Sequence, residues 1–164
     1  MRLHTLSASL LASLALTAQT TVTVSTGAAN STQSWYSFQN GVVASAPLAD
    51  WDLAFEIVGF TSSILVNTAK GLSVWETPAA IGAWADVNTV DESNWTVIHN
   101  SDTDWSAGAL TSGNDLDQPD GFNVGWGTYN VITHTIVGTR IYEVGLGEGV
   151  YKKLRINSLL SGTY

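Results

Sequence analysis

Trp51-Asp52-Leu53-Ala54-Phe55 is the stretch of sequence that decides the fold. Apolar and polar residues alternate over residues 51–57, a pattern that predicts a strand with one buried face. A second strand-like run, Ser34-Trp35-Tyr36-Ser37-Phe38, lies shortly before it. Asn40-Gly41, followed by Val42-Val43, predicts a type I′ hairpin turn and its return strand. This order of elements predicts an all-β protein.

The rest of the chain continues this pattern. The seven tryptophans and fifteen glycines, with only 12% charged residues, favour short strands and tight turns over helices. The alternating Thr and Val residues at 20–26 predict the first strand. Further strands are expected within 62–67, 72–75, 94–99, 125–136, 140–146 and 151–156. We therefore expect a single antiparallel β-rich domain over residues 19–164.

Residues 1–18 have the pattern of a signal peptide. Arg2 and His4 form a short basic start, and residues 6–16 form an apolar run that is too short to span a bilayer. The expected cleavage follows Ala18, and an uncleaved anchor is the alternative. The sequence thus predicts a secreted or cell-surface protein, and no second apolar run has the length of a transmembrane segment.

The acidic charge balance argues against a nucleic-acid partner. Fourteen acidic residues face six basic ones, which gives a formal net charge of −8. Nucleic-acid binding requires a basic face, so we expect no nucleic-acid partner. The chain has no cysteine, so burial and hydrogen bonds must stabilise the exported domain without disulfides.

The order of these elements resembles the HmuY-like family, secreted β-proteins of Bacteroidota that include haem binders. The resemblance rests on the 35–43 hairpin, the strand pair at 51–67, Gly125-Trp126, and the closing hairpin at 140–156. It implies an all-β HmuY-like domain that holds haem between loops at one end, for haem acquisition at the cell surface. In that family a further strand follows here, so we expect this sequence to be a fragment cut one strand short. Longer relatives often carry a sorting domain for type IX secretion.

The resemblance also implies a pair of histidine ligands for haem. His99 and His134 are the two histidines that remain after signal-peptide removal, and both lie in the later part of the domain. Haem iron takes axial ligands such as His or Met. The alternative is two structural histidines, one exposed at a loop edge and one paired with Thr133 or Thr135 in a strand. The resemblance implies haem, and host haemoproteins as its source.

Two other binding sites are open alternatives. Asp115, Asp117 and Asp120 lie in the long polar loop 100–123 and could bind calcium through their oxygens, or could cap turns in a solvated loop. Trp105, in the same loop, could stack on a sugar ring of a surface glycan, or pack in the core as large aromatics usually do.

Catalytic motifs are missing from the sequence. It contains no Gly-x-Ser-x-Gly elbow, no His-Glu-x-x-His pair and no phosphate-binding loop. We therefore expect a protein that is not an enzyme and that binds haem or another small ligand. The alternatives are a structural or adhesive cell-surface β-module without haem, and a glycan- or calcium-binding β-sandwich.

Overall fold

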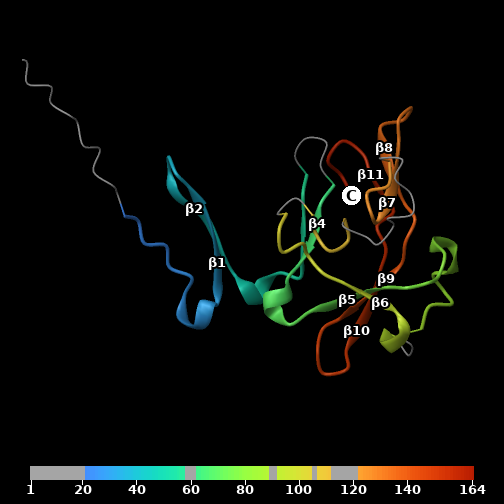
Figure 1. The fold of residues 1–164 in the computed structure, drawn as a ribbon, viewed down its shortest axis with the longest axis horizontal. Coiled ribbons are helices and arrows are strands. Elements are labelled where there is room, and N and C mark those ends of the chain that lie inside the picture. The colour runs from blue at the N-terminus through green and yellow to red at the C-terminus, as the bar shows by residue number, and fades with distance from the viewer. Residues whose placement is uncertain (1–20, 58–61, 89–91, 105–106, 112–121) are drawn as a thin grey trace, which may run out of the picture.

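The computed structural model describes residues 21–57, 62–88, 92–104, 107–111 and 122–164. Within these ranges the chain forms strands and short 3₁₀ turns and no α-helix (Figure 1). The strands are β1 (Thr32–Ser37), β2 (Gly41–Pro47), β3 (Leu53–Phe55), β4 (Ile64–Val66), β5 (Ser73–Glu76), β6 (Thr96–Ile98), β7 (Gly127–Asn130), β8 (Thr135–Gly138), β9 (Tyr142–Gly145), β10 (Tyr151–Leu154) and β11 (Ser158–Leu159). The 3₁₀ turns are η1 (Ala28–Asn30), η2 (Leu48–Asp50), η3 (Thr68–Lys70), η4 (Ile81–Ala83) and η5 (Glu92–Asn94). The prediction of an all-β protein is confirmed.

The strands form four small antiparallel sheets. Their orders are β1-β2, β3-β4, β10-β9-β5-β6 and β11-β8-β7. The four-stranded sheet joins segments that are far apart in the sequence, since β9 pairs with β10 on one side and with β5 on the other. This sheet positions the candidate site described below.

The β1-β2 hairpin lies to one side of the rest of the molecule (Figure 1). The expected hairpin is confirmed, but its turn is not type I′, which needs a positive φ at both central residues. Ser37 pairs with Gly41, and of the turn residues only Gly41 has a positive φ, of 75°. The Ser37 hydroxyl accepts hydrogen bonds from the N–H groups of Gln39 and Asn40, and so favours the longer loop.

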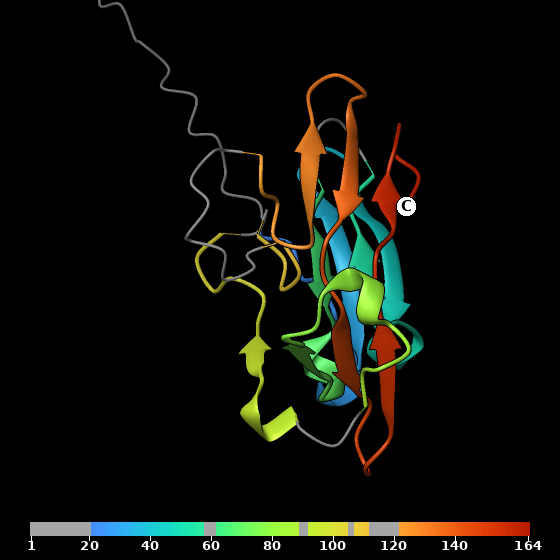
Figure 2. The same cartoon turned by 90° about the vertical axis from the view of Figure 1, so that its right-hand side faces the viewer.

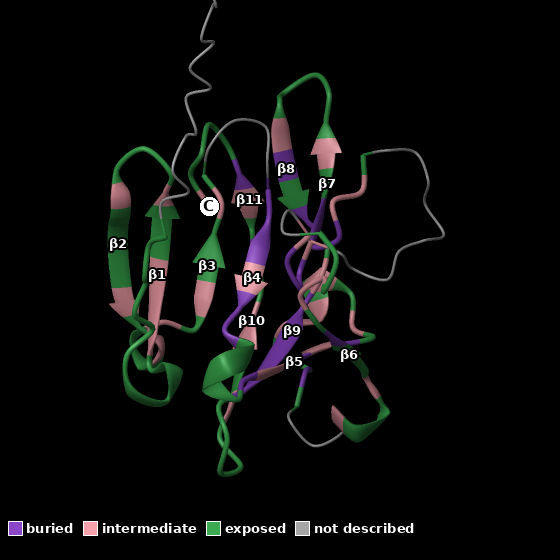
Figure 3. Ribbon diagram, turned by 60° about the vertical axis from the view of Figure 1, so that its left-hand side comes forward, coloured by how far each residue is buried: buried purple, intermediate pink, exposed green. Residues whose placement is uncertain are grey.

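Trp126 lies at the centre of the hydrophobic core. Its side chain is fully buried, and its indole N–H donates a hydrogen bond to the Ser62 carbonyl over 3.0 Å. The buried colouring in Figure 3 runs through β4, β5 and β9, whereas β1 and β2 are half-buried or exposed. The buried core that contains Trp126 also includes Ile64, Val74, Leu110 and Tyr142. Leu53 is partly buried and packs against this core.

Two expected strands differ from the structure. Residues 21–26 are exposed and form no strand, so the strand predicted at 20–26 is wrong over the part that the structure describes. Alternating Thr and Val suit a strand, but a strand also needs a hydrogen-bonded neighbour, and none of the described strands pairs with residues 21–26. The strand predicted over residues 51–57 is shorter, because only Leu53–Phe55 pairs with β4.

The C-terminal residues fold back onto the core. Leu160 and Thr163 close a tight turn through an isolated bridge. The Tyr164 hydroxyl then donates to the Glu56 carbonyl over 2.9 Å, and its ring lies 5.7 Å from that of Trp126. Burial, with a smaller effect from the charge of Glu56, raises the pKa of Tyr164 to about 12.

Several predictions from the sequence lie outside the described residues. They are the signal peptide at 1–18, the stacking residue Trp105, and the calcium ligands Asp115, Asp117 and Asp120. In the part of the chain that the structure does describe, no helix is long and apolar enough to cross a membrane.

The first testable prediction concerns Trp126. Trp126→Ala removes a fully buried side chain and leaves a cavity, so we expect it to lower the free energy of unfolding by about 3–5 kcal/mol. Trp35→Ala, at a side chain that is 45% exposed on β1, is the control and should change it by about 0.5 kcal/mol or less. Urea unfolding followed by circular dichroism measures both. Equal losses in the two variants would contradict the position of Trp126 in the core.

Candidate functional site

His134 lies in the exposed turn between β7 and β8. Its φ is 54°, in the left-handed region, which is uncommon for residues other than glycine. Its Nδ1 atom is hydrogen-bonded to the Tyr129 hydroxyl at 2.7 Å, and the two ring centroids are 6.2 Å apart. This contact within one hairpin fixes the orientation of the imidazole. The expected pairing with Thr133 or Thr135 is replaced by a pairing with Tyr129.

His99 lies in another part of the molecule. It is exposed and directly follows β6, at the edge of the four-stranded sheet, whereas His134 belongs to the β11-β8-β7 sheet. In Figures 1 and 2 the tip of the β7-β8 hairpin lies well away from β6. Neither imidazole lines the pocket described next. In the described ranges, the structure therefore does not bring the two histidines to a common cavity.

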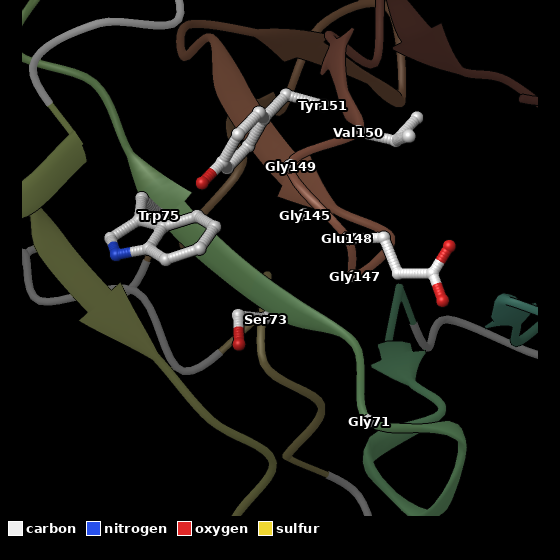
Figure 4. A pocket seen from close by; sticks show the side chains of 9 residues that line it. All are labelled: Gly71, Ser73, Trp75, Gly145, Gly147, Glu148, Gly149, Val150 and Tyr151. Atoms are coloured by element: carbon white, nitrogen blue, oxygen red, sulfur yellow. The ribbon is translucent and has the colours of Figure 1, made fainter.

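A shallow pocket lies on the outer face of the four-stranded sheet, where β5 meets the β9-β10 hairpin. Its volume is about 180 Å³. Trp75 and Tyr151 supply its two large side chains, and their ring centroids are 6.1 Å apart with a 52° angle between the planes. Figure 4 shows both rings with the other lining residues: Gly71, Ser73, Gly145, Gly147, Glu148, Gly149 and Val150.

Glycines give this pocket its shape. Gly145 pairs with Ser73 on one side and with Tyr151 on the other. A Cβ atom at position 145 would lie 2.9 Å from Cζ3 of Trp75, so only glycine lets the indole lie this close to the sheet. In the following loop Gly147, Glu148 and Gly149 all have positive φ values, of 88°, 52° and 75°. This loop forms one edge of the pocket.

Two carboxylates lie on the same face of the sheet as the aromatic pair. Glu143 is opposite Trp75 on one neighbouring strand and Lys153 on the other, and its side chain is fully buried. Burial raises the pKa of Glu143, and the charge of Glu92 raises it further. The Tyr151 hydroxyl donates to Oε1 of Glu92 over 3.2 Å, so this acidic pair adjoins the pocket.

The opposite face of the sheet carries a different charged pair. Arg140 forms an ion pair with Glu76 and also donates from Nε to the Gly125 carbonyl over 2.9 Å. Burial, followed by the charge of Glu76, raises the pKa of the neighbouring Tyr142 well above its usual range. Glu76 therefore has a cationic partner in Arg140.

No family model, curated protein or solved structure matches this chain. The functional argument therefore rests on the residues of the chain itself. The described residues hold no group of three or more His, Asp or Glu side chains arranged around a metal ion. The candidate site is the pocket of Trp75 and Tyr151, together with the adjoining carboxylates of Glu92 and Glu143.

The raised pKa of Glu143 gives a testable prediction. A carboxyl group whose pKa is higher in the folded than in the unfolded protein binds more protons when folded, so its contribution to stability falls as the pH rises. In metal-free buffer Glu143→Gln should therefore be more stable than the original chain at about pH 8, and the difference should shrink towards about pH 5. Urea unfolding across this range measures the difference.

The control is Glu148→Gln, which removes the same charge from an exposed residue. The difference in unfolding free energy between Glu148→Gln and the original chain should not shrink in this way as the pH falls. A difference between Glu143→Gln and the original chain that stays constant over the whole pH range would contradict the raised pKa.

Proposed function

We propose that this chain is an exported, non-catalytic binding protein whose ligand is a sugar residue of a surface glycan, bound against the rings of Trp75 and Tyr151. The observation that carries the proposal is the pair of aromatic side chains, 6.1 Å apart, in a pocket that opens on the surface of the sheet. Aromatic rings provide apolar faces with little conformational freedom to lose, which suits the flat apolar face of a sugar ring.

The other lining groups support a small polar ligand. The Ser73 hydroxyl can hydrogen-bond a sugar hydroxyl at the edge of the pocket. The volume of about 180 Å³ is below the range of about 300–1,000 Å³ that is typical of sites for drug-sized molecules. A pocket of this size favours a single ring over an extended cofactor.

The lining also favours binding over chemistry. Hydrolysis of a glycosidic bond ordinarily uses two carboxyl groups on either side of the bond. Glu148 is the one carboxylate among the lining residues, and of the two adjoining acids Glu143 is fully buried and Glu92 accepts the hydrogen bond from Tyr151. A serine nucleophile needs a neighbouring general base, and no histidine lies beside Ser73 in this lining. These features support a binding role.

Haem is a second candidate ligand, on the family resemblance and on one observation at His134. The Tyr129 hydroxyl is hydrogen-bonded to Nδ1 of His134 at 2.7 Å, so the bond does not involve Nε2, and the residue is exposed. A hydrogen bond to the second ring nitrogen is the usual way in which proteins orient a metal-ligating histidine. The pocket of Trp75 and Tyr151 does not fit haem, because it is small and contains no histidine. Haem would therefore have to bind at the β7-β8 hairpin, with His134 as its ligand.

The glycan proposal predicts loss of binding in pocket variants. Trp75→Ala and Tyr151→Ala each remove a stacking face, and we expect each to weaken glycan binding about tenfold, a change of about 1.4 kcal/mol. A glycan array identifies the ligand, and isothermal titration calorimetry with that ligand measures the affinity. Failure of every glycan to bind would contradict the proposal.

Two control variants make this experiment specific. Tyr151→Phe keeps the ring and loses only the hydrogen bond to Glu92, so stacking should persist. Trp35→Ala removes an exposed tryptophan from β1, away from the pocket, and should bind as the original chain does. Equal weakening by Trp35→Ala and Trp75→Ala would place glycan binding elsewhere.

The haem candidate predicts a spectroscopic change. Titration with haemin should shift the Soret band, and His134→Ala should abolish the shift because it removes the iron ligand. Tyr129→Phe keeps the imidazole but frees its Nδ1, and should weaken haem binding about 10- to 100-fold. A Soret shift that survives in the double variant His99→Ala, His134→Ala would exclude both histidines as ligands.

A further inference from the structure

Glu143 has a buried carboxyl group that the described residues leave without a hydrogen-bond partner. The side chain lies in the middle of β9 and is fully buried, and neither carboxylate oxygen has a hydrogen-bond partner. Oε2 of Glu92 is also buried and unpartnered. A buried carboxylate without compensation is very costly, so three such oxygens in one region call for a compensating group.

The nearest donors are directed to other acceptors. Lys153 is opposite Glu143 on β10, but its ammonium group donates to the Trp84 carbonyl over 2.7 Å and lies 4.9 Å from the Trp84 ring centroid. The Tyr151 hydroxyl donates to the other oxygen of Glu92, Oε1. The local donors therefore leave both oxygens of Glu143 uncompensated.

The two carboxylates share one neighbourhood. Tyr151 pairs with Gly145, two residues after Glu143 on β9, so the Tyr151 and Glu143 side chains lie on the same face of the sheet. The Tyr151 hydroxyl donates to Glu92 over 3.2 Å. Glu143 comes from a central strand of the sheet, whereas Glu92 begins η5, in the segment that leads into β6. Two acids brought together from separate elements need either a shared proton or a bound cation.

The chemistry of the donors favours a hard cation. The groups at this position are carboxylates and a phenol, which provide oxygen atoms and no nitrogen or sulfur atoms. Calcium takes six to eight oxygen ligands in flexible geometry, drawn from carboxylates, carbonyls and water. A chain with a formal net charge of −8 also attracts cations from solution.

We propose that Glu143 and Glu92 bind a calcium ion on the outer face of the four-stranded sheet. Two glutamates can supply up to four ligand oxygens, and backbone carbonyls and water would complete the coordination. The ion would compensate the buried charge of Glu143 and attach η5 to β9. Because an ion that binds only the folded chain stabilises it, calcium would also stabilise the wall of the neighbouring pocket.

The experiment is thermal unfolding of the full chain with EDTA and then with about 1 mM calcium, a concentration typical of extracellular calcium modules. We expect calcium to raise the Tm by about 3 °C or more, as an added stability of about 1 kcal/mol would. Glu143→Gln and Glu92→Gln should each abolish the rise. Terbium, which replaces calcium, should luminesce in the original chain through excitation of Trp75 and Tyr151, and should not in these variants.

Two control variants distinguish calcium at this site from calcium bound elsewhere on the chain. Glu148→Gln removes an exposed charge near the same hairpin and should keep the full rise in Tm. The triple variant Asp115→Asn, Asp117→Asn, Asp120→Asn removes the acidic loop and should also keep it. If Glu143→Gln failed to fold, Glu92→Gln and the terbium titration of the original chain would still test the proposal.

Three outcomes would overturn the proposal. The first is a chain whose Tm does not respond to calcium and that does not sensitise terbium, which would indicate a proton shared by the two carboxylates instead. The second is a calcium response that survives in both Glu143→Gln and Glu92→Gln. The third is a response that only the triple aspartate variant loses, which would place calcium in the acidic loop.

Discussion

The rest of the structure depends on the contacts of Trp126, which join sheets that share no backbone ladder. Its indole N–H donates to the Ser62 carbonyl just before β4, whereas its own carbonyl accepts a hydrogen bond from Thr139 and so extends the pairing of β7 with β8. Its ring also packs near Tyr164, which in turn contacts Phe55 on β3. Two of the sheets have only two strands, and an isolated two-stranded hairpin is marginally stable at best in water. One large aromatic side chain shared among them makes them a single core.

Local patterns were enough to predict hairpins, and they failed where pairing is not local. The β1-β2 and β9-β10 hairpins follow from alternating residues on either side of a turn, and both are confirmed. The pairing of β5 with β9 joins residues almost seventy positions apart, and no short sequence pattern predicts such a pairing. Residues 21–26 were predicted to be a strand from their composition, but none of the described strands pairs with them. The HmuY-like resemblance stays a prediction.

The sequence directed attention to histidines and aspartates, whereas the structure places its candidate site at an aromatic pair and a buried acid. Histidine and aspartate are recognised by residue type, but Trp75 and Tyr151 become a site only because Gly145 lies between them in the sheet. One signal was available in the sequence. Glu143 stands between Tyr142 and Val144 in a strand whose two faces are both buried, and an acid at such a position needs a compensating partner.

The distribution of charge explains why both proposed sites lie in the later part of the chain. No charged residue occurs between His4 and Asp50, so the β1-β2 hairpin is neutral, and all fourteen acidic residues follow it. An electrostatic field strong enough to attract a cation or orient a polar ligand must therefore come from the sheets after β2. Within those sheets Arg140 neutralises Glu76 on one face, and Lys153 is turned towards Trp84 on the other. Glu92 and Glu143, beside the aromatic pocket, form no ion pair with the described residues, so charge and shape favour the same face of the molecule.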